Sequence, residues 1–241
     1  KPLLQDTGPQ RFKYALDPEN LTVSADIGAL CVSRPTNPSG NLLTSAEMDQ
    51  LLAVARQAGV PLLVDLPYGS PFPGIVYQAC DNPWRTGAVH VLSLSKLGLP
   101  GVRTAIVVAD EALIRSVTRA NTIMTLANNN LGPALVERLI ASGDLARLSQ
   151  RVLPDFYRDQ RDYFVELLDS ALQGLPYRIH EPQGAFFVWL WLEHLPGGAH
   201  ALYEALKKQG VLLMAGEPFF FGWDQSWAHA RECLRLTYCQ P

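Results

Sequence analysis

The sequence predicts an α/β protein: a mostly parallel sheet with flanking helices, followed by a smaller α+β unit. Two observations support this fold class. In the first half, short apolar runs alternate with helical or loop segments, and strands that are apolar on both faces are typical of a parallel sheet covered on both sides. In the last third, short strand-like runs follow one long helical pattern. The four apolar runs of the first half are residues 27–32, 60–64, 89–92 and 104–108.

A helix is predicted between the first two apolar runs. Thr44 is followed three residues later by Glu47, the spacing of a capping box at a helix start. Met48 and Leu51 continue the pattern at helical spacing, and Gly59 marks the end. The connection between these two strands is therefore expected to be a helical crossover.

The remaining chain predicts a helical region and then the second unit. From about Glu111 the pattern is helical, with a break around residues 128–133, and residues 154–172 form one long amphipathic pattern ending at Gly174. We place the boundary near residue 150, giving a first domain of residues 1–150 and a second of 151–241. In the second, strands are expected at 177–180, 185–191, 211–214 and 233–238, and a helix at 200–209.

Composition indicates a soluble globular protein and argues against several classes of partner. The chain has 241 residues, is 48% hydrophobic and carries a net charge of −3 without a basic run, so nucleic acid and anionic membranes are not expected partners. The apolar stretch at 184–192 is too short to span a bilayer, and residues 1–6 do not resemble a signal peptide. The first residues resemble an internal segment of a longer sequence.

The cysteines and histidines predict neither a disulfide framework nor a metal site. The four cysteines form no C-x-x-C pair, and the five histidines form no cluster at zinc-ligand spacing. A reducing, cytoplasmic location is the simpler interpretation. The cysteines are Cys31, Cys80, Cys233 and Cys239.

Reactive side chains follow three consecutive predicted strands. Asn37 follows the first, Asp65 and Tyr68 the second, and Lys96 and Arg103 the third. Each alone has an ordinary explanation, since Asn-Pro-x-Gly is a turn signal, an Asp often caps a turn, and a loop Lys is usually solvated. Because ligands of open α/β sheets bind beyond the carboxyl ends of the strands, their joint occurrence predicts one binding crevice.

These motifs resemble the signature set of the fold-type-I, pyridoxal-phosphate-dependent aminotransferases of class I/II. The similarity covers nearly the whole chain, and the residues at 31–38, 71–75 and 93–101 most resemble those of the valine–pyruvate branch. In that branch, as in this chain, seven positions separate the lysine from the arginine that follows it, one fewer than in many relatives. The matching motifs are Asn37-Pro38-Ser39-Gly40, Asp65 with Tyr68, Ser93-Leu94-Ser95-Lys96 with Arg103, Pro182-Gln183-Gly184-Ala185-Phe186-Phe187, and Leu234-Arg235-Leu236-Thr237-Tyr238.

The resemblance implies pyridoxal 5′-phosphate as cofactor and assigns roles to the residues around it. Lys96 would carry the cofactor on its amine and then move a proton during the reaction. Asp65, as a buried carboxylate, would keep the cofactor's ring nitrogen protonated. Asn37 and Tyr68 would hydrogen-bond its phenolic oxygen, and the bond before Pro38 is expected to be cis.

The same resemblance implies contacts to the phosphate and to the substrate. Ser93 and Arg103 would bind the phosphate, with Ser95 as a further cofactor contact. Arg235 would clamp the substrate's α-carboxylate, together with Asn37, and Gly184 would allow the backbone to approach the substrate. The structural alternative for Arg235 is an exposed arginine on an edge strand. The aromatic runs 186–191 and 219–223 are interpreted as packing.

The expected activity is transfer of an amino group between a small neutral or branched-chain amino acid (valine or alanine) and a 2-oxo acid (pyruvate), in a ping-pong cycle within a homodimer. The resemblance also implies an N-terminal part, with a phosphate loop and a ring-stacking aromatic residue, and a C-terminal helix, none of which this sequence contains. At 128–130 three asparagines stand where it implies small residues and glycine. The alternatives are a carbon–sulfur lyase on the same fold, a cofactor-sensing domain of a regulator, which would need a basic DNA-binding module, and a truncated, non-catalytic domain.

Overall fold

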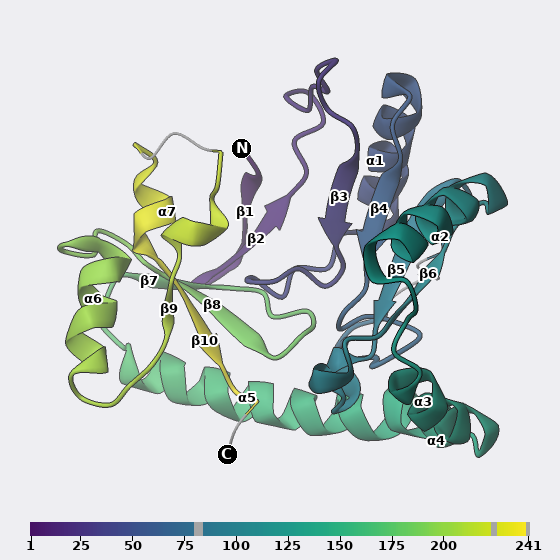
Figure 1. Cartoon of the computed structure of the whole chain (residues 1–241). Coiled ribbons are helices and arrows are strands. Elements are labelled where there is room, and N and C mark those ends of the chain that lie inside the picture. Colours follow the sequence, from purple (N-terminus) through teal and green to yellow (C-terminus); the bar gives the residue numbers. More distant parts are fainter. Residues whose placement is uncertain (80–83, 223–225, 240–241) are drawn as a thin grey trace.

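Two separate sheets organise the chain (Figure 1). A four-stranded sheet has the order β3-β4-β5-β6, and a six-stranded sheet has the order β1-β2-β7-β8-β10-β9. This computed structural model describes residues 1–79, 84–222 and 226–239. Cys80 and Trp223, both considered above, lie outside the described residues.

The four-stranded sheet is mostly parallel, as predicted. Strands β3 (Leu30–Ser33), β4 (Leu62–Asp65) and β5 (Ala88–Ser93) run parallel, and β6 (Ala105–Val108) pairs antiparallel with β5. Each strand lies within or beside a predicted apolar run. Buried side chains of β4 and β5 form one hydrophobic core with helix α1, among them Leu62, Val64 and Leu92.

Helix α1 (Ser45–Ala58) has the caps that its sequence predicts. The Thr44 hydroxyl accepts a hydrogen bond from the Glu47 amide at 3.2 Å, and the Glu47 carboxylate accepts one from the Thr44 amide at 2.7 Å. Gly59 ends the helix with a φ of 69°, the left-handed conformation that favours glycine. Met48 and Leu52 point into the core, so the amphipathic pattern is satisfied by packing on the sheet.

Four helices continue the first unit and lead into the second. They are α2 (Glu111–Thr125), α3 (Leu131–Ala141), α4 (Asp144–Arg147) and α5 (Leu153–Ala171), with a π-helical turn at Leu148–Val152. The predicted break falls between α2 and α3. Full cover of both sheet faces was expected and is not found, because α2 buries none of its residues and Ile106 and Val108 of β6 are 39% and 41% exposed. No described helix is long and apolar enough to cross a membrane.

The six-stranded sheet combines the C-terminal strands with the start of the chain. Strands β7 (Tyr177–His180), β8 (Phe187–Leu192) and β10 (Cys233–Thr237) agree closely with the prediction, whereas β9 is only Met214–Ala215. Helix α6 (Gly198–Lys207) lies near its predicted range, and α7 (Ala228–Glu232) was not predicted. Val211 and Leu212, expected in the strand at 211–214, lie outside β9 and are 49% and 74% exposed.

The N-terminal hairpin was also not predicted. Strands β1 (Leu3–Gly8) and β2 (Arg11–Ala15) pair antiparallel, and β2 pairs parallel with β7. Phe12 of β2 packs with Trp189 and Cys233 in a small core of the second sheet. The first residues therefore belong to the sheet of the second unit, although the sequence placed them in the first. The division near residue 150 otherwise remains a prediction.

Candidate active site

The carboxyl ends of β3, β4 and β5 lie side by side. Ser33 is opposite Asp65 in the first strand pair, and Asp65 is opposite Val91 in the second. Asn37 and Lys96 follow the ends of β3 and β5, so the register brings the three predicted strand-end motifs to one edge of the sheet. This arrangement arises from parallel pairing, which aligns strand ends that lie far apart in sequence.

Asp65 is the last residue of β4 and faces the open edge. Its carboxylate accepts a hydrogen bond from the Ser33 hydroxyl at 3.0 Å, and its backbone carbonyl accepts one from the Arg34 amide at 2.9 Å. The side chain was expected to be buried and is instead exposed, because it leaves the strand at the uncovered end of the sheet. Neighbouring protein atoms still desolvate the carboxylate and raise its pKa above the usual value, against the opposing effect of the Ser33 bond.

Lys96 stands on a short 3-10 turn (Ser95–Leu97) against an aromatic wall. Its Nζ lies 5.6 Å from the ring centroid of Tyr68 and 5.5 Å from that of Phe186. Tyr68 is only 3% exposed, and burial raises the pKa of its phenol to about 12. The phenol is therefore protonated at neutral pH and able to donate a hydrogen bond.

The three residues proposed for the phosphate form a local cluster. Arg103 donates through Nη1 to the Ser95 hydroxyl at 3.4 Å and to the Pro100 carbonyl at 3.3 Å, and the Ser95 amide donates to the Ser93 hydroxyl at 3.2 Å. Arg103 is exposed and adopts a φ of 47°. The loop after β5 therefore presents one guanidinium and two hydroxyls around the turn of Lys96.

Arg235 and Asn37 join the two sheets. Arg235 lies in β10, and its Nη1 donates to the Asn37 side-chain oxygen at 2.8 Å. β10 pairs with β8 on one side and with β9 on the other, so the edge-strand explanation for this arginine is wrong. The Asn37–Pro38 bond is cis, as the family resemblance implied.

Two glycines allow the backbones behind this contact to touch. Gly40 has a φ of 69°, and a Cβ at this position would lie 2.7 Å from the Gly184 carbonyl oxygen. A Cβ on Gly184 would lie 2.4 Å from Pro35 Cγ and 2.9 Å from the Ile75 carbonyl oxygen. Close packing within the chain is thus sufficient reason for glycine at both positions, and the substrate role of Gly184 stays a prediction.

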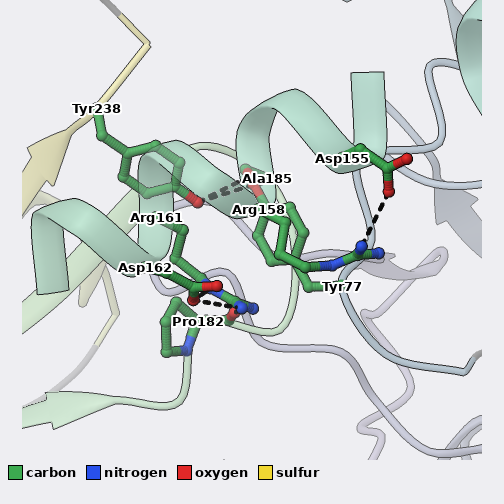
Figure 2. Close-up of polar contacts among 8 residues, drawn as sticks. All are labelled: Tyr77, Asp155, Arg158, Arg161, Asp162, Pro182, Ala185 and Tyr238. Carbon is green, nitrogen blue, oxygen red and sulfur yellow. Dashed lines mark hydrogen bonds and ion pairs between the residues drawn. The ribbon is translucent and has the colours of Figure 1, made fainter. Parts of the chain in front are cut away.

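The residue after Gly184 is held by two tyrosines, which the sequence did not indicate (Figure 2). Ala185 has a φ of 63°, and its amide donates to the Ile75 carbonyl at 2.9 Å. Its carbonyl accepts hydrogen bonds from the hydroxyls of Tyr77 and Tyr238, the latter at 3.1 Å, and the two hydroxyls are 2.9 Å apart. Since Tyr77 and Tyr238 are 161 positions apart, no local pattern could reveal this pair.

Helix α5 supports the same turn from below. Arg161 places its guanidinium 4.6 Å from the ring centroid of Tyr77 and donates to the Pro182 carbonyl at 3.3 Å. Its charge is balanced by Asp162 at 2.6 Å, and Arg158 pairs with Asp155 one turn earlier (Figure 2). The turn that carries Gly184 and Ala185 is therefore in contact with both units of the chain.

The aromatic run starting at Phe186 does more than pack. Phe186 lies over Lys96, and Phe187 lies over Arg235, whose Cζ is 4.7 Å from its ring centroid. The interpretation as packing holds for Trp189, which is fully buried. For Phe186 and Phe187 it was incomplete, because Phe186 contacts a cation that follows a strand of the other sheet and Phe187 contacts one on the neighbouring strand.

Two cavities of the described chain lie beside these residues rather than among them. One of about 440 Å³ is lined by Arg103, Asn121, Asn128 and other residues of β6 and α2, and Arg103 is its one candidate site residue. Another, of about 220 Å³, is lined by Thr36 and Pro38, which flank Asn37, and by Trp189 and Phe219. Hydrogen bonds and ring contacts therefore define the candidate site better than these two cavities do.

Comparison with known proteins places the chain among aminotransferases. It is 42% identical over 228 residues to the valine–pyruvate aminotransferase of Escherichia coli (strain K12), a match covering 95% of this chain and 55% of that protein. It is 24% identical over 197 residues to the mitochondrial kynurenine/α-aminoadipate aminotransferase of Rattus norvegicus, covering 76% of this chain and 44% of that protein. The chain thus spans about half the length of the curated relatives it matches.

Solved structures agree with this placement. The crystal structure of valine–pyruvate aminotransferase from Salmonella typhimurium LT2 is similar with a TM-score of 0.94 and 38% identity, covering 100% of this chain and 62% of that one. A tetra mutant of aspartate aminotransferase from Thermus thermophilus, at 20% identity and a TM-score of 0.79 over 94% of this chain and 60% of that one, shares the fold. The family model of aminotransferase class I and II matches residues 12–241, and the chain therefore belongs to this family.

Proposed function

We propose that this chain carries the cofactor lysine and the substrate-carboxylate arginine of a pyridoxal-phosphate-dependent aminotransferase. The whole protein would move an amino group between valine or alanine, or a similar small amino acid, and a 2-oxo acid such as pyruvate. The observation that carries the proposal is the meeting of the two sheets at Asn37 and Arg235, beside the strand ends that hold Asp65 and Lys96. The narrower substrate pair is supported by the 42% identity to a valine–pyruvate aminotransferase.

The residues present suit pyridoxal phosphate, the cofactor on which this family depends. Asp65 has one hydrogen-bond partner for its carboxylate among the described residues, the Ser33 hydroxyl, and desolvation raises its pKa. A protonated ring nitrogen would supply the cation that this carboxylate needs. Arg103, with Ser93 and Ser95, provides donors of the kind that bind a phosphate dianion.

Each residue has a task that its chemistry allows. When bound, the cofactor withdraws electrons from the substrate and makes the proton on its Cα removable. Lys96 would hold the cofactor through its amine, then accept that proton and return it. Tyr68 and Asn37 would donate hydrogen bonds to the cofactor's phenolic oxygen, and Arg235 would hold the α-carboxylate, with its five N–H donors in a rigid fork.

The setting of the protein is part of the proposal. We propose a homodimer in the cytoplasm, with an amino acid and a 2-oxo acid as its small-molecule partners. Dimers are usual in this family. Cys31, Cys233 and Cys239 are free, as is usual in a reducing compartment.

The test compares the full chain with Lys96→Ala after incubation with pyridoxal phosphate. The parent should show a visible absorption band that borohydride makes permanent, and a tryptic peptide containing residue 96 should carry the added mass. Lys96→Ala should lack both, whereas Lys208→Ala, which replaces the exposed lysine just after α6, should behave like the parent. Equal labelling of the parent and Lys96→Ala would refute the assignment of Lys96.

A second measurement separates the proposed reaction from its closest alternative. The loaded protein is given alanine or valine with and without a 2-oxo acid, and the products are quantified. A transaminase forms the new amino acid only when the acceptor is present. Release of ammonia and pyruvate from an amino acid such as cysteine without an acceptor would favour a carbon–sulfur lyase instead.

A further inference from the structure

Three aromatic rings stand in contact with the two functional cations of the candidate site. Tyr68, Phe186 and Phe187 touch one another edge to face, with centroid separations of 5.1 Å, 5.4 Å and 5.0 Å. Lys96 lies over Tyr68 and Phe186, and Arg235 lies over Phe187. One cluster of rings therefore contacts a cation from each sheet.

The Arg235 guanidinium also contacts a second aromatic ring. Its Cζ lies 5.4 Å from the ring centroid of Phe219, in the 3-10 turn between β9 and α7, and 4.7 Å from that of Phe187. Asn37 holds Nη1, and Met214 contacts Nη2 through its sulfur. Among the described residues, no carboxylate pairs with this guanidinium. Burial lowers its pKa.

A guanidinium bound in this way keeps donors free for a ligand. Ring faces attract a planar cation electrostatically without occupying its N–H groups. Two of the five N–H donors have neighbours in Asn37 and Met214, which leaves the others for an incoming carboxylate. An Asp or Glu side chain paired with Arg235 would instead have occupied the N–H donors that the substrate's carboxylate needs.

We propose that Phe187 and Phe219 are positioning residues that hold Arg235 for the substrate's α-carboxylate. The inference rests on the proposed function and adds to it two residues that would act through their contact with Arg235. Phe187 is 4% exposed and comes from β8, next to β10 in the sheet, so it forms the rigid side of the support. Phe219 comes from the 3-10 turn Glu217–Phe219, so the second ring is supplied by a segment outside the sheet.

Phe219 has a competing role that the experiment must separate. It also lines the cavity of about 220 Å³ with Pro38 and Trp189, and that cavity could receive a substrate side chain. A pocket wall would affect substrates according to their side chains. A residue that positions Arg235 would affect every substrate alike, because the α-carboxylate is common to all.

The experiment uses the full chain loaded with pyridoxal phosphate and compares Phe219→Leu with the parent. The dissociation constants of pyruvate and 3-methyl-2-oxobutanoate are measured by calorimetry, and KM and kcat for alanine and valine by a coupled assay. We expect both dissociation constants and both KM values to rise together by about 2- to 30-fold, the range of cation–π contacts from exposed to desolvated sites. The kcat values should change less than KM.

Three further variants make the result specific. Phe219→Tyr keeps the ring and should restore affinity, and Phe187→Leu should reproduce the loss. Phe220→Leu is the matched control, because this neighbouring ring lines the same cavity and contacts Trp189 and Trp227, whereas the rings on Arg235 among the described residues are Phe187 and Phe219. Circular dichroism and unfolding curves establish that each variant folds.

The outcomes distinguish the inference from the proposed function. Unchanged affinities in both Phe219→Leu and Phe187→Leu overturn the positioning role. A loss confined to the larger side chain makes Phe219 a pocket wall and also overturns it. If Arg235→Lys binds both oxo acids as well as the parent does, the carboxylate role of Arg235 itself is wrong, and the proposed function fails at that residue.

Discussion

Replacing Gly40 with alanine tests how tightly the two sheets meet beside Arg235. Gly40 closes the turn that carries Asn37, with its amide donating to the Thr36 carbonyl at 2.8 Å. Its φ is 69°, and a Cβ would stand 2.7 Å from the carbonyl oxygen of Gly184. The substitution therefore combines backbone strain with a steric clash.

The two effects can be separated because Gly59 has the same φ of 69° and nothing within 4 Å of its added Cβ. A left-handed conformation costs an alanine about 1–2 kcal/mol, partly offset by about 0.4–1 kcal/mol from the lower entropy of the unfolded chain. We therefore expect Gly59→Ala to lose about 1 kcal/mol. Gly40→Ala should lose about 1–3 kcal/mol more, because the clash is with backbone that cannot rotate away.

Equilibrium urea denaturation of the parent and both variants measures the difference, with unchanged m-values as the condition for comparing midpoints. In the same samples, the affinity for pyruvate reports on Arg235, whose Asn37 contact depends on this turn. Equal destabilisation by Gly40→Ala and Gly59→Ala would refute the reasoning, since it would mean that the approach to Gly184 relaxes without cost.

Two other sets of variants test buried groups. Tyr77→Phe and Tyr238→Phe each remove one donor to the Ala185 carbonyl, so each should lower the unfolding free energy by about 0.5–1.5 kcal/mol. The double variant should lose more than the sum, because the carbonyl then has neither hydroxyl, and strict additivity in urea denaturation would contradict this. Burial lowers the pKa of His180 to about 3 and that of His229 to about 4, from 6.5. Because the unfolded chain binds protons below pH 6.5 that the folded histidines do not, stability should fall between pH 6.5 and 5, by about 2 kcal/mol per histidine at pH 5. Replacing either histidine by glutamine should flatten this slope, and an unchanged slope in both variants would exclude them as its source.

The parts of the fold that the sequence predicted are those set by local chemistry. Helix α1 begins and ends where Thr44, Glu47 and Gly59 place it, because caps act over three or four residues. Strands β4 and β5 were predicted because their side chains enter one core and leave continuous apolar runs. The motifs at the strand ends were predicted in the same way, because they follow the apolar runs directly in the sequence.

The N-terminal hairpin shows why the remaining elements could not be predicted. Five of the six residues of β1 are exposed, so this strand has no buried face to reveal it. It forms because β2 pairs with β7, which follows it by more than half of the chain. A hydrogen-bonded backbone ladder leaves little trace in composition when few of its side chains are buried.

The candidate site divides in the same way. Lys96, Asp65 and Asn37 were identified because each follows a strand in a family motif. The contacts that support them join distant segments, as when Arg235 meets Asn37 or Tyr77 meets Tyr238. Such pairings require the two sheets to be assembled, and a single sequence does not contain that information.

The geometry of the site therefore depends on the junction between the sheets as much as on the residues expected to act. Lys96 follows a strand of one sheet and Arg235 lies in the other, and the proposed reaction needs the amine near the Cα of a substrate held by the guanidinium. That spacing is set by groups that perform no chemistry, including the close backbones of Gly40 and Gly184 and the hydroxyls on Ala185. Helix α5 runs beneath both sheets, and its Arg161 donates a hydrogen bond to the Pro182 carbonyl beside this turn (Figure 1). A change at the junction should therefore shift Lys96 relative to Arg235 without altering either side chain. Such variants should lower kcat for every amino acid alike.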